Sequence, residues 1–256
     1  MDVDLDMEGA DAGTRPAKSE QTRALILETA LRLFRENGYD GTTMRAIARE
    51  AGVSVGNAYY YFASKDHLVQ GFYDRLAEDH RERFRDAVAG LTDFRARLQA
   101  TLETWFDVAE PYHEFSAQLF KNAADPNSPL SPFSAQSAPA RDAVIALYTD
   151  VLAGSDAKVD AELAALLPEL LWLYHLGIVV YWVYDRSPGA ERTRRLLVRC
   201  TALVARLVSL SRFKLLRPVV REVSDLLSEF FLKPGRPVEP VEPVGLVEPA
   251  GPVTPE

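Results

Sequence analysis

The amino-acid sequence predicts an all-α protein, and two observations carry this prediction. From Glu20 to about Leu232, apolar residues recur at spacings of three and four, which is the period of an amphipathic helix, and no stretch alternates as a strand does. Glycine, proline and Ser/Asp clusters interrupt this period at intervals that suit separate helices. The chain has 256 residues, 47% of them hydrophobic, which supplies the core of one large domain or of two modest ones.

The helix breaks divide the chain into ten expected helices and four segments. The helices are expected at residues 19–37, 43–50, 54–61, 65–88, 91–108, 112–124, 138–152, 159–185, 188–212 and 216–232. Residues 125–139 contain four prolines and several serines, and we expect a loop there. The expected segments are a disordered acidic tail over 1–14, a three-helix domain over 15–68, a helical bundle over 69–232 and a disordered proline-rich tail over 233–256.

Charge is distributed unevenly along the chain. The net charge of −8 at pH 7 excludes a protein that coats nucleic acid through charge alone. Residues 14–68 differ from this average, because they hold eight basic against six acidic side chains. Specific DNA binding requires only a local basic surface, so the N-terminal segment stays a candidate for it.

Cysteine content and hydropathy predict a cytoplasmic protein. The single cysteine, Cys200, cannot form an internal disulfide, which suits a reducing compartment. The acidic N-terminus lacks the apolar stretch of a secretory signal. The most apolar run, residues 170–184, contains a histidine and is shorter than the about 20 residues that a membrane span needs. We therefore expect a buried bundle helix at this run and no membrane segment.

Residues 19–61 have the pattern of two short helices braced by a longer one. The long helix has an apolar face, and Gly38 supplies the left-handed residue that ends such a helix. Thr43 and Ser54 are placed to cap the two short helices, and Gly52 allows a tight turn between them. Short helices joined by a glycine-containing turn predict a helix-turn-helix.

The start of the third helix has side chains suited to reading DNA. Residues 54–57 are small, so a helix that begins with them can approach base edges in the major groove. Asn57 can bond an adenine edge, and Val55 can contact a thymine methyl group. The hydroxyl groups of Tyr59 and Tyr60 can donate to phosphate oxygens. Lys65 lies in the first turn of the next helix, where a cation and a helix N-terminus together attract phosphate.

Four segments carry a resemblance to a known family. They are ILETALRLF at 26–34, NGY at 37–39, TTMRAIA at 42–48 and AGVSVGNAYYYFASKDHL at 51–68. Together they resemble the N-terminal, homeodomain-like helix-turn-helix domain of TetR family transcriptional regulators. The resemblance implies an all-helical homodimer that binds a palindromic operator and usually represses. It also implies a C-terminal domain that binds a small effector and thereby releases DNA.

The resemblance implies DNA contacts at nine positions of this sequence. They are Thr43, Arg45, Ser54, Val55, Gly56, Asn57, Tyr59, Tyr60 and Lys65. Residues 54–57 would face bases or backbone, and Thr43, Tyr59, Tyr60 and Lys65 would contact phosphates. Tyr60 departs from the family pattern, because many members carry a polar or basic residue at this position.

Other interpretations of side chains in this segment stay open. Tyr59 is equally expected in the core, and Phe62 is expected there. For Arg15 and Lys18 we favour a solvated tail over an arm that reaches a groove. An exposed helix face is favoured over DNA contacts for Arg32, Arg35 and Arg49.

Beyond residue 68 the resemblance becomes a helical pattern without a motif. Side chains that suit a pocket for a hydrophobic or aromatic effector are Trp105, Tyr112, His113, Gln118, Tyr148, Trp172 and His175. Ordinary core packing is the competing interpretation for each of them. An apolar stripe on the helix at 188–212 is wider than one intrachain contact needs, and it predicts a dimer interface. Its members are Leu196, Cys200, Leu203, Leu207 and Leu210.

Motifs of catalysis and metal binding are missing from the sequence. We find no Gly-rich phosphate loop, nucleophile elbow or carboxylate pair, and His113, His175 and Cys200 lack metal-like spacing. We therefore expect no enzyme, no cofactor and no metal. The expected partners are double-stranded DNA, a second copy of the chain and an unidentified small molecule. An activator, or a regulator that acts through a protein bound by the proline-rich tail, stays open.

Overall fold

The computed structural model describes residues 14–211 and Glu222, and every regular element in this part of the chain is a helix. The elements are α1 Thr14–Asn37, α2 Met44–Glu50, α3 Val55–Tyr61, α4 Lys65–Ala87, α5 Phe94–Ala109, η1 Glu110–Tyr112, α6 His113–Ala123, α7 Ala138–Ala153, α8 Ala161–Tyr184, η2 Pro188–Ala190 and α9 Glu191–Leu210. The expected tails at 1–13 and 233–256 lie outside the described residues, as does the expected helix at 216–232 apart from Glu222.

Three helices start three or more residues away from the position that the periodicity predicted. Helix α1 begins at Thr14, so the interpretation of Arg15 and Lys18 as a tail is wrong, and Pro16 falls in the first turn, where it is tolerated. Helix α5 begins after Asp93, whose carboxylate accepts a hydrogen bond from the amide of Ala96 at 2.7 Å. Helix α9 begins only at Glu191, because the two residues before it have left-handed backbone conformations.

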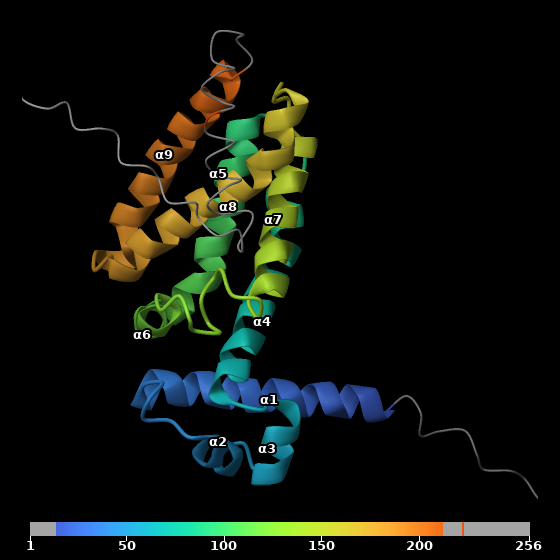
Figure 1. The fold of residues 1–256 in the computed structure, drawn as a ribbon, viewed down its shortest axis with the longest axis vertical. Helices are drawn as coiled ribbons and strands as arrows, with labels where there is room; N and C mark the ends of the chain where they lie inside the picture. The colour runs from blue at the N-terminus through green and yellow to red at the C-terminus, as the bar shows by residue number, and fades with distance from the viewer. Residues whose placement is uncertain (1–13, 212–221, 223–256) are drawn as a thin grey trace, which may run out of the picture.

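The helices build two hydrophobic cores that meet at α4 and α6. Figure 1 shows α1, α2 and α3 gathered at one end of the molecule, with α4 leading from them into a bundle with α5, α7, α8 and α9. The N-terminal core includes Ile26, Phe34, Ile47 and Phe62, and α6 contributes Phe115 to it. The helix-turn-helix is therefore braced by α6, a helix from outside the N-terminal three-helix segment.

A buried arginine joins the ends of two bundle helices. The Arg97 side chain is 8% exposed, and it donates to the carbonyl oxygens of Val88 and Leu91 at 3.3 and 2.9 Å. It also donates to those of Asp150 and Val151 at 2.9 and 3.1 Å. A cation at a helix C-terminus satisfies orphan carbonyls and complements the helix dipole. Arg97 therefore ties the C-terminal ends of α4 and α7 to α5.

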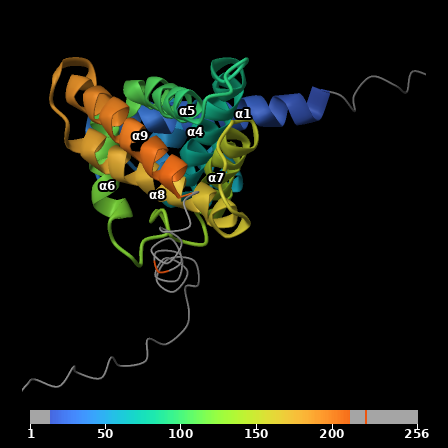
Figure 2. The same cartoon turned by 90° about the horizontal axis from the view of Figure 1, so that it is seen from above.

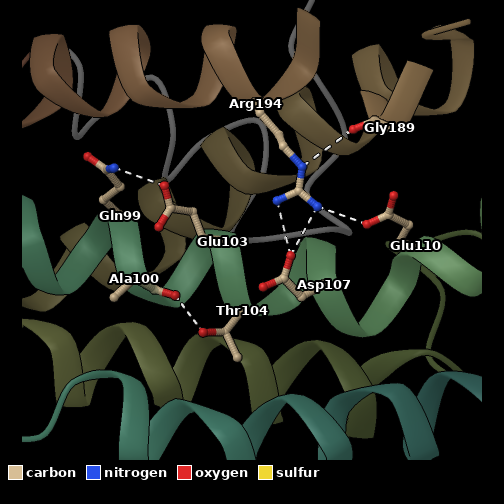
Figure 3. A network of polar contacts seen from close by, with 8 residues as sticks. All are labelled: Gln99, Ala100, Glu103, Thr104, Asp107, Glu110, Gly189 and Arg194. Carbon is tan, nitrogen blue, oxygen red and sulfur yellow. Dashed lines mark hydrogen bonds and ion pairs between the residues drawn. The ribbon is translucent and has the colours of Figure 1, made fainter. Parts of the chain in front are cut away.

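Helix α9 lies at the outside of the bundle, beside α5 and α8 (Figures 1 and 2). Figure 3 shows Arg194 of α9 reaching down to α5, where both terminal nitrogens lie 3.0 Å from Asp107 Oδ1. Nη2 also donates to Glu110 Oε2 at 2.8 Å. These groups are well exposed, so each pair contributes only about 0–1 kcal/mol. The network orients α9 more than it stabilises it.

Helix α8 is longer than the apolar run identified in the sequence. By length and composition alone it could cross a membrane, with a mean hydropathy of 1.8 over 18 residues. A core helix of a soluble bundle passes the same test, and α8 packs against α6, α7 and α9. Of that window 33% is buried within the chain, and most of its other residues are half-buried.

Candidate functional site

The turn between α2 and α3 is held by local hydrogen bonds. Gly52 has a φ of 67°, a left-handed conformation that glycine adopts without strain. The amide of Val53 then donates to the carbonyl of Ala48 at 3.0 Å. The Thr43 and Ser54 hydroxyl oxygens accept from the amides of Ala46 and Asn57 at 3.2 and 3.1 Å, which caps α2 and α3. The sequence predicted both caps and this turn.

The start of α3 is open to solvent. Ser54, Val55 and Gly56 are exposed, and Asn57 is half-buried. Tyr60 is 80% exposed and Tyr59 is 50% exposed, so Tyr59 is not a core residue. Phe62 is buried in the N-terminal core, as predicted. The structure therefore brings the small residues and the two tyrosines together on an uncovered surface at one end of the molecule (Figure 1).

The two α2 residues expected at DNA, Thr43 and Arg45, are also exposed. Of the three arginines expected on a solvated face, Arg35 and Arg49 are exposed. The third, Arg32, is partly covered and pairs with Glu50 at 2.8 Å and with Glu36 at 3.4 Å.

Lys65 is engaged inside the protein. Its ammonium group donates to the carbonyl of Tyr39 at 2.7 Å and lies 4.3 Å above the centre of the Tyr39 ring. The Tyr39 hydroxyl in turn donates to Asp66, and burial followed by this hydrogen bond raises the pKa of Tyr39. Lys65 thus fixes the loop after α1 against the start of α4. Any phosphate contact would compete with that role.

A cavity of about 190 Å³ lies within the bundle, bounded by α4, α5, α6, α7 and α8. Four of the seven residues expected at an effector pocket line it: Trp105, Tyr112, Trp172 and His175. An apolar cavity of about 150 Å³ is large enough to bind benzene. The space therefore suits a small apolar molecule.

The other three expected pocket residues lie elsewhere. His113 is bonded through Nε2 to the carbonyl of Trp182 at 2.7 Å. Gln118 is exposed and faces Gly38 at the end of α1. Tyr148 is fully buried behind the wall, against the ring of His175. None of these three residues lines this cavity, because each side chain turns to a neighbouring helix or to solvent.

Sequence reasoning missed the wall that α4 and α7 provide. The missed residues include Phe72, Tyr73, Leu76, Ala140, Arg141 and Val144. Apolar residues at 72, 73, 76 and 77 share one face of α4, and this spacing was the available signal.

Buried polar groups border the cavity at His175. His175 lies 4.7 Å from Trp105 and 6.5 Å from His80, between ring centres. Burial, together with the neighbouring His80, lowers the pKa of His175 to about 3. Burial likewise lowers the pKa of His80 to about 4. Both rings are therefore neutral at physiological pH. The described residues contain no group of three or more potential metal ligands.

The apolar stripe of α9 divides into two parts. Leu203, Leu207 and Leu210 are 56%, 57% and 43% exposed. Leu196 and Cys200 are half-buried and pack against the bundle core, so they are not part of an open face. On α8 two large aromatic side chains, Tyr181 and Tyr184, are also exposed.

Two family matches cover most of the chain. Residues 26–71 match the family described as bacterial regulatory proteins, tetR family. Residues 97–226 match the tetracyclin repressor-like C-terminal domain, which extends the resemblance well past residue 68.

Curated relatives match about a third of the chain. The HTH-type transcriptional repressor KstR2 of Rhodococcus jostii is 34% identical over 91 residues, which cover 36% of this chain and 45% of that protein. The aligned region spans less than half the length of the curated relatives that this chain matches.

Solved structures share the fold. A TetR transcriptional regulator from Nitrosomonas europaea has a TM-score of 0.57 at 19% identity, over 72% of this chain and 98% of the other. FadR from Bacillus subtilis, solved in complex with stearoyl-CoA, has a TM-score of 0.54 at 18% identity, over 74% and 99%. The observed helix-turn-helix and helical bundle are consistent with the two family matches. The chain belongs to the TetR family of transcriptional regulators.

Proposed function

We propose that this protein is a homodimeric, sequence-specific DNA-binding repressor that a small hydrophobic or aromatic effector releases from a palindromic operator. The observation that carries the proposal is the capped, uncovered start of α3, where small side chains lie beside exposed tyrosines. A helix presented in this way can enter the major groove without steric hindrance. Asn57 and Val55 would contact base edges, and Thr43, Arg45 and Tyr60 would contact the backbone.

A dimer supplies the two recognition helices that a palindrome requires. The exposed leucines of α9 and the exposed tyrosines of α8 are the surface that we assign to the second copy. Because α8 is apolar over most of its length yet only partly covered, association would remove a large apolar area from water. The two helices from each copy would then form a four-helix contact.

The cavity and the DNA-binding domain share walls, which gives the effector a route of action. Phe72 and Leu119 line the cavity and also belong to the N-terminal core. Phe115 lies between them and α1, with its ring stacked on Phe34 at 5.6 Å and on edge to Phe72 at 5.9 Å. A molecule that displaces this aromatic layer would shift α1 and α4. The two recognition helices would then leave the spacing of about 34–36 Å that matches one DNA turn.

The cavity is accessible to a direct test, because all three tryptophans of the chain line it. Compounds that change the intrinsic fluorescence of the purified protein should lower its affinity for operator DNA. Ala140→Trp, which fills the cavity, should abolish both responses while DNA binding persists. Ala146→Trp, on the exposed face of the same helix, is the matched control. An effector that still releases DNA from the Ala140→Trp variant would show that this cavity is not the effector site.

A further inference from the structure

Three buried polar atoms around His175 have no hydrogen-bond partner among the described residues. They are Nε2 of His175, Nδ1 of His80 and the hydroxyl oxygen of Tyr148. They come from three helices, α8, α4 and α7, and all three side chains are more than nine-tenths buried. Leaving a buried polar group unpaired is unfavourable, so three such groups close together call for a partner.

The three side chains cluster where His175 lines the cavity wall. The ring centre of His175 is 6.1 Å from that of Tyr148 and 6.5 Å from that of His80. His80 donates through Nε2 to the carbonyl of Thr101 at 2.9 Å, which leaves Nδ1 as a lone-pair acceptor. Of the three residues, only His175 is among those that line the cavity, so its side chain is the nearest of the three to an occupant.

The rings around His175 are uncharged, and this favours a neutral occupant over an anion. The rings within contact of His175 are those of His80, Trp105, Phe106 and Tyr148, and none is a cation at neutral pH. Arg141 is the one lysine or arginine that lines the cavity within the described residues, and it already donates to the carbonyls of Pro132 and Ser134. A buried carboxylate at His175 would lack a counter-ion and pay the full desolvation penalty.

We infer that the cavity binds a neutral molecule with an apolar skeleton and one hydrogen-bonding oxygen, and that His175 holds this oxygen. A hydroxyl group is the best fit, because a neutral imidazole nitrogen can accept from it or donate to it. The remaining wall is almost entirely apolar and aromatic, which suits a ring or short chain. The inference rests on the proposed function, and it adds the chemical class of the effector and the residue that recognises it.

The test uses matched probes on the full-length protein, with tryptophan fluorescence as the readout. Cyclohexanol carries the hydroxyl group, methylcyclohexane replaces it by a methyl group, and cyclohexanecarboxylate replaces it by an anion. His175→Phe should weaken cyclohexanol binding about five-fold, which corresponds to one neutral hydrogen bond. The same substitution should leave methylcyclohexane binding unchanged or tighter. His67→Phe, at an exposed position on α4, should change neither affinity.

A second readout needs no variant. In ¹⁵N spectra of the wild-type histidines, cyclohexanol should shift the Nε2 resonance of His175, and methylcyclohexane should not. Equal effects of His175→Phe on both probes, no cyclohexanol-specific shift, or tighter binding of the anion would overturn the inference but leave the cavity as the effector site. Binding of none of the probes would overturn the inference and the cavity assignment together, and operator binding by the same preparation would show whether the DNA-binding part stands.

Discussion

We expect base selection by α3 to depend on Asn57. It is half-buried in the first turn of α3, and its backbone amide donates to the Ser54 cap. Its side-chain amide makes no hydrogen bond within the described residues and is therefore available for a base edge. Asn57→Ala should therefore relax base preference at one position of each half-site by about 1–3 kcal/mol. Competition binding with operators mutated one base at a time measures this. Uniform weakening at every position would instead assign Asn57 to the DNA backbone.

For Lys65, the sequence motif did not reveal which groups the side chain contacts. Its position matches a family phosphate contact, but its ammonium group is bonded to the Tyr39 carbonyl and covers the Tyr39 ring. The partner lies 26 residues away in sequence, so no local spacing could have indicated it. The caps at Thr43 and Ser54, by contrast, were predictable, because a cap depends on atoms three residues apart.

His80 and His175 should make stability depend on pH. Their pKa values in the fold, about 4 and about 3, lie below the value near 6.5 of an unfolded histidine. The unfolded chain therefore binds protons that the fold does not. Stability is complete above about pH 6.5 and falls as the pH decreases toward 4.

Urea unfolding at pH 7 and pH 5, at one protein concentration, measures this loss. His175→Phe should remove its own share, about 2 kcal/mol of the difference between the two pH values. An identical pH dependence in wild type and variant would contradict neutral burial of His175.

Arg97 is the clearest case in which one side chain determines how helices meet. Arg97→Met leaves the carbonyls of Val88, Leu91, Asp150 and Val151 without their donor at the ends of α4 and α7. Because hydrogen bonds to a charged group contribute about 1.5–3 kcal/mol, we expect a loss of at least about 3 kcal/mol in unfolding free energy. Thermal or urea unfolding measures it, and the exposed Arg95→Met is the control. Equal stability of the two variants would contradict this role.

The outer face of α9 should control assembly. Leu203→Glu together with Leu207→Glu places two charges where the proposed partner packs, so the protein should become monomeric and lose operator affinity. Ser209→Glu changes a neighbouring exposed position and should remain dimeric. Sedimentation equilibrium distinguishes the species. A double variant that stays dimeric would move the interface to another surface.

At the level of elements, periodicity predicted the helices well and their assignment to surfaces less well. The stripe from Leu196 to Leu210 was identified, but its first two members pack against the bundle core and its last three are exposed. An apolar stripe in the sequence does not indicate whether the bundle of the same chain or a second copy covers each turn of the helix. The part of the cavity wall that α4 provides was not predicted, because α4 contributes residues both to the cavity and to the N-terminal core.

At the scale of the whole molecule, we propose that three features act together. They are the uncovered helix α3, an apolar face for a second copy, and a cavity that shares walls with the DNA-binding core. The sequence predicted the fold class and the helix-turn-helix because those depend on local pattern. The cavity depends on five helices brought together by tertiary packing, so composition predicted its aromatic character but only part of its wall.

Selection of bound DNA from a random library by the full-length protein, at defined salt, tests the central claim most directly. We expect enrichment of one inverted repeat whose half-site centres lie about one helical turn, or a multiple of it, apart. Affinity for the selected site should fall steeply with salt, because phosphate contacts release counter-ions. Recovery of unrelated sequences without a shared half-site would contradict a dimer that reads a palindrome through α3.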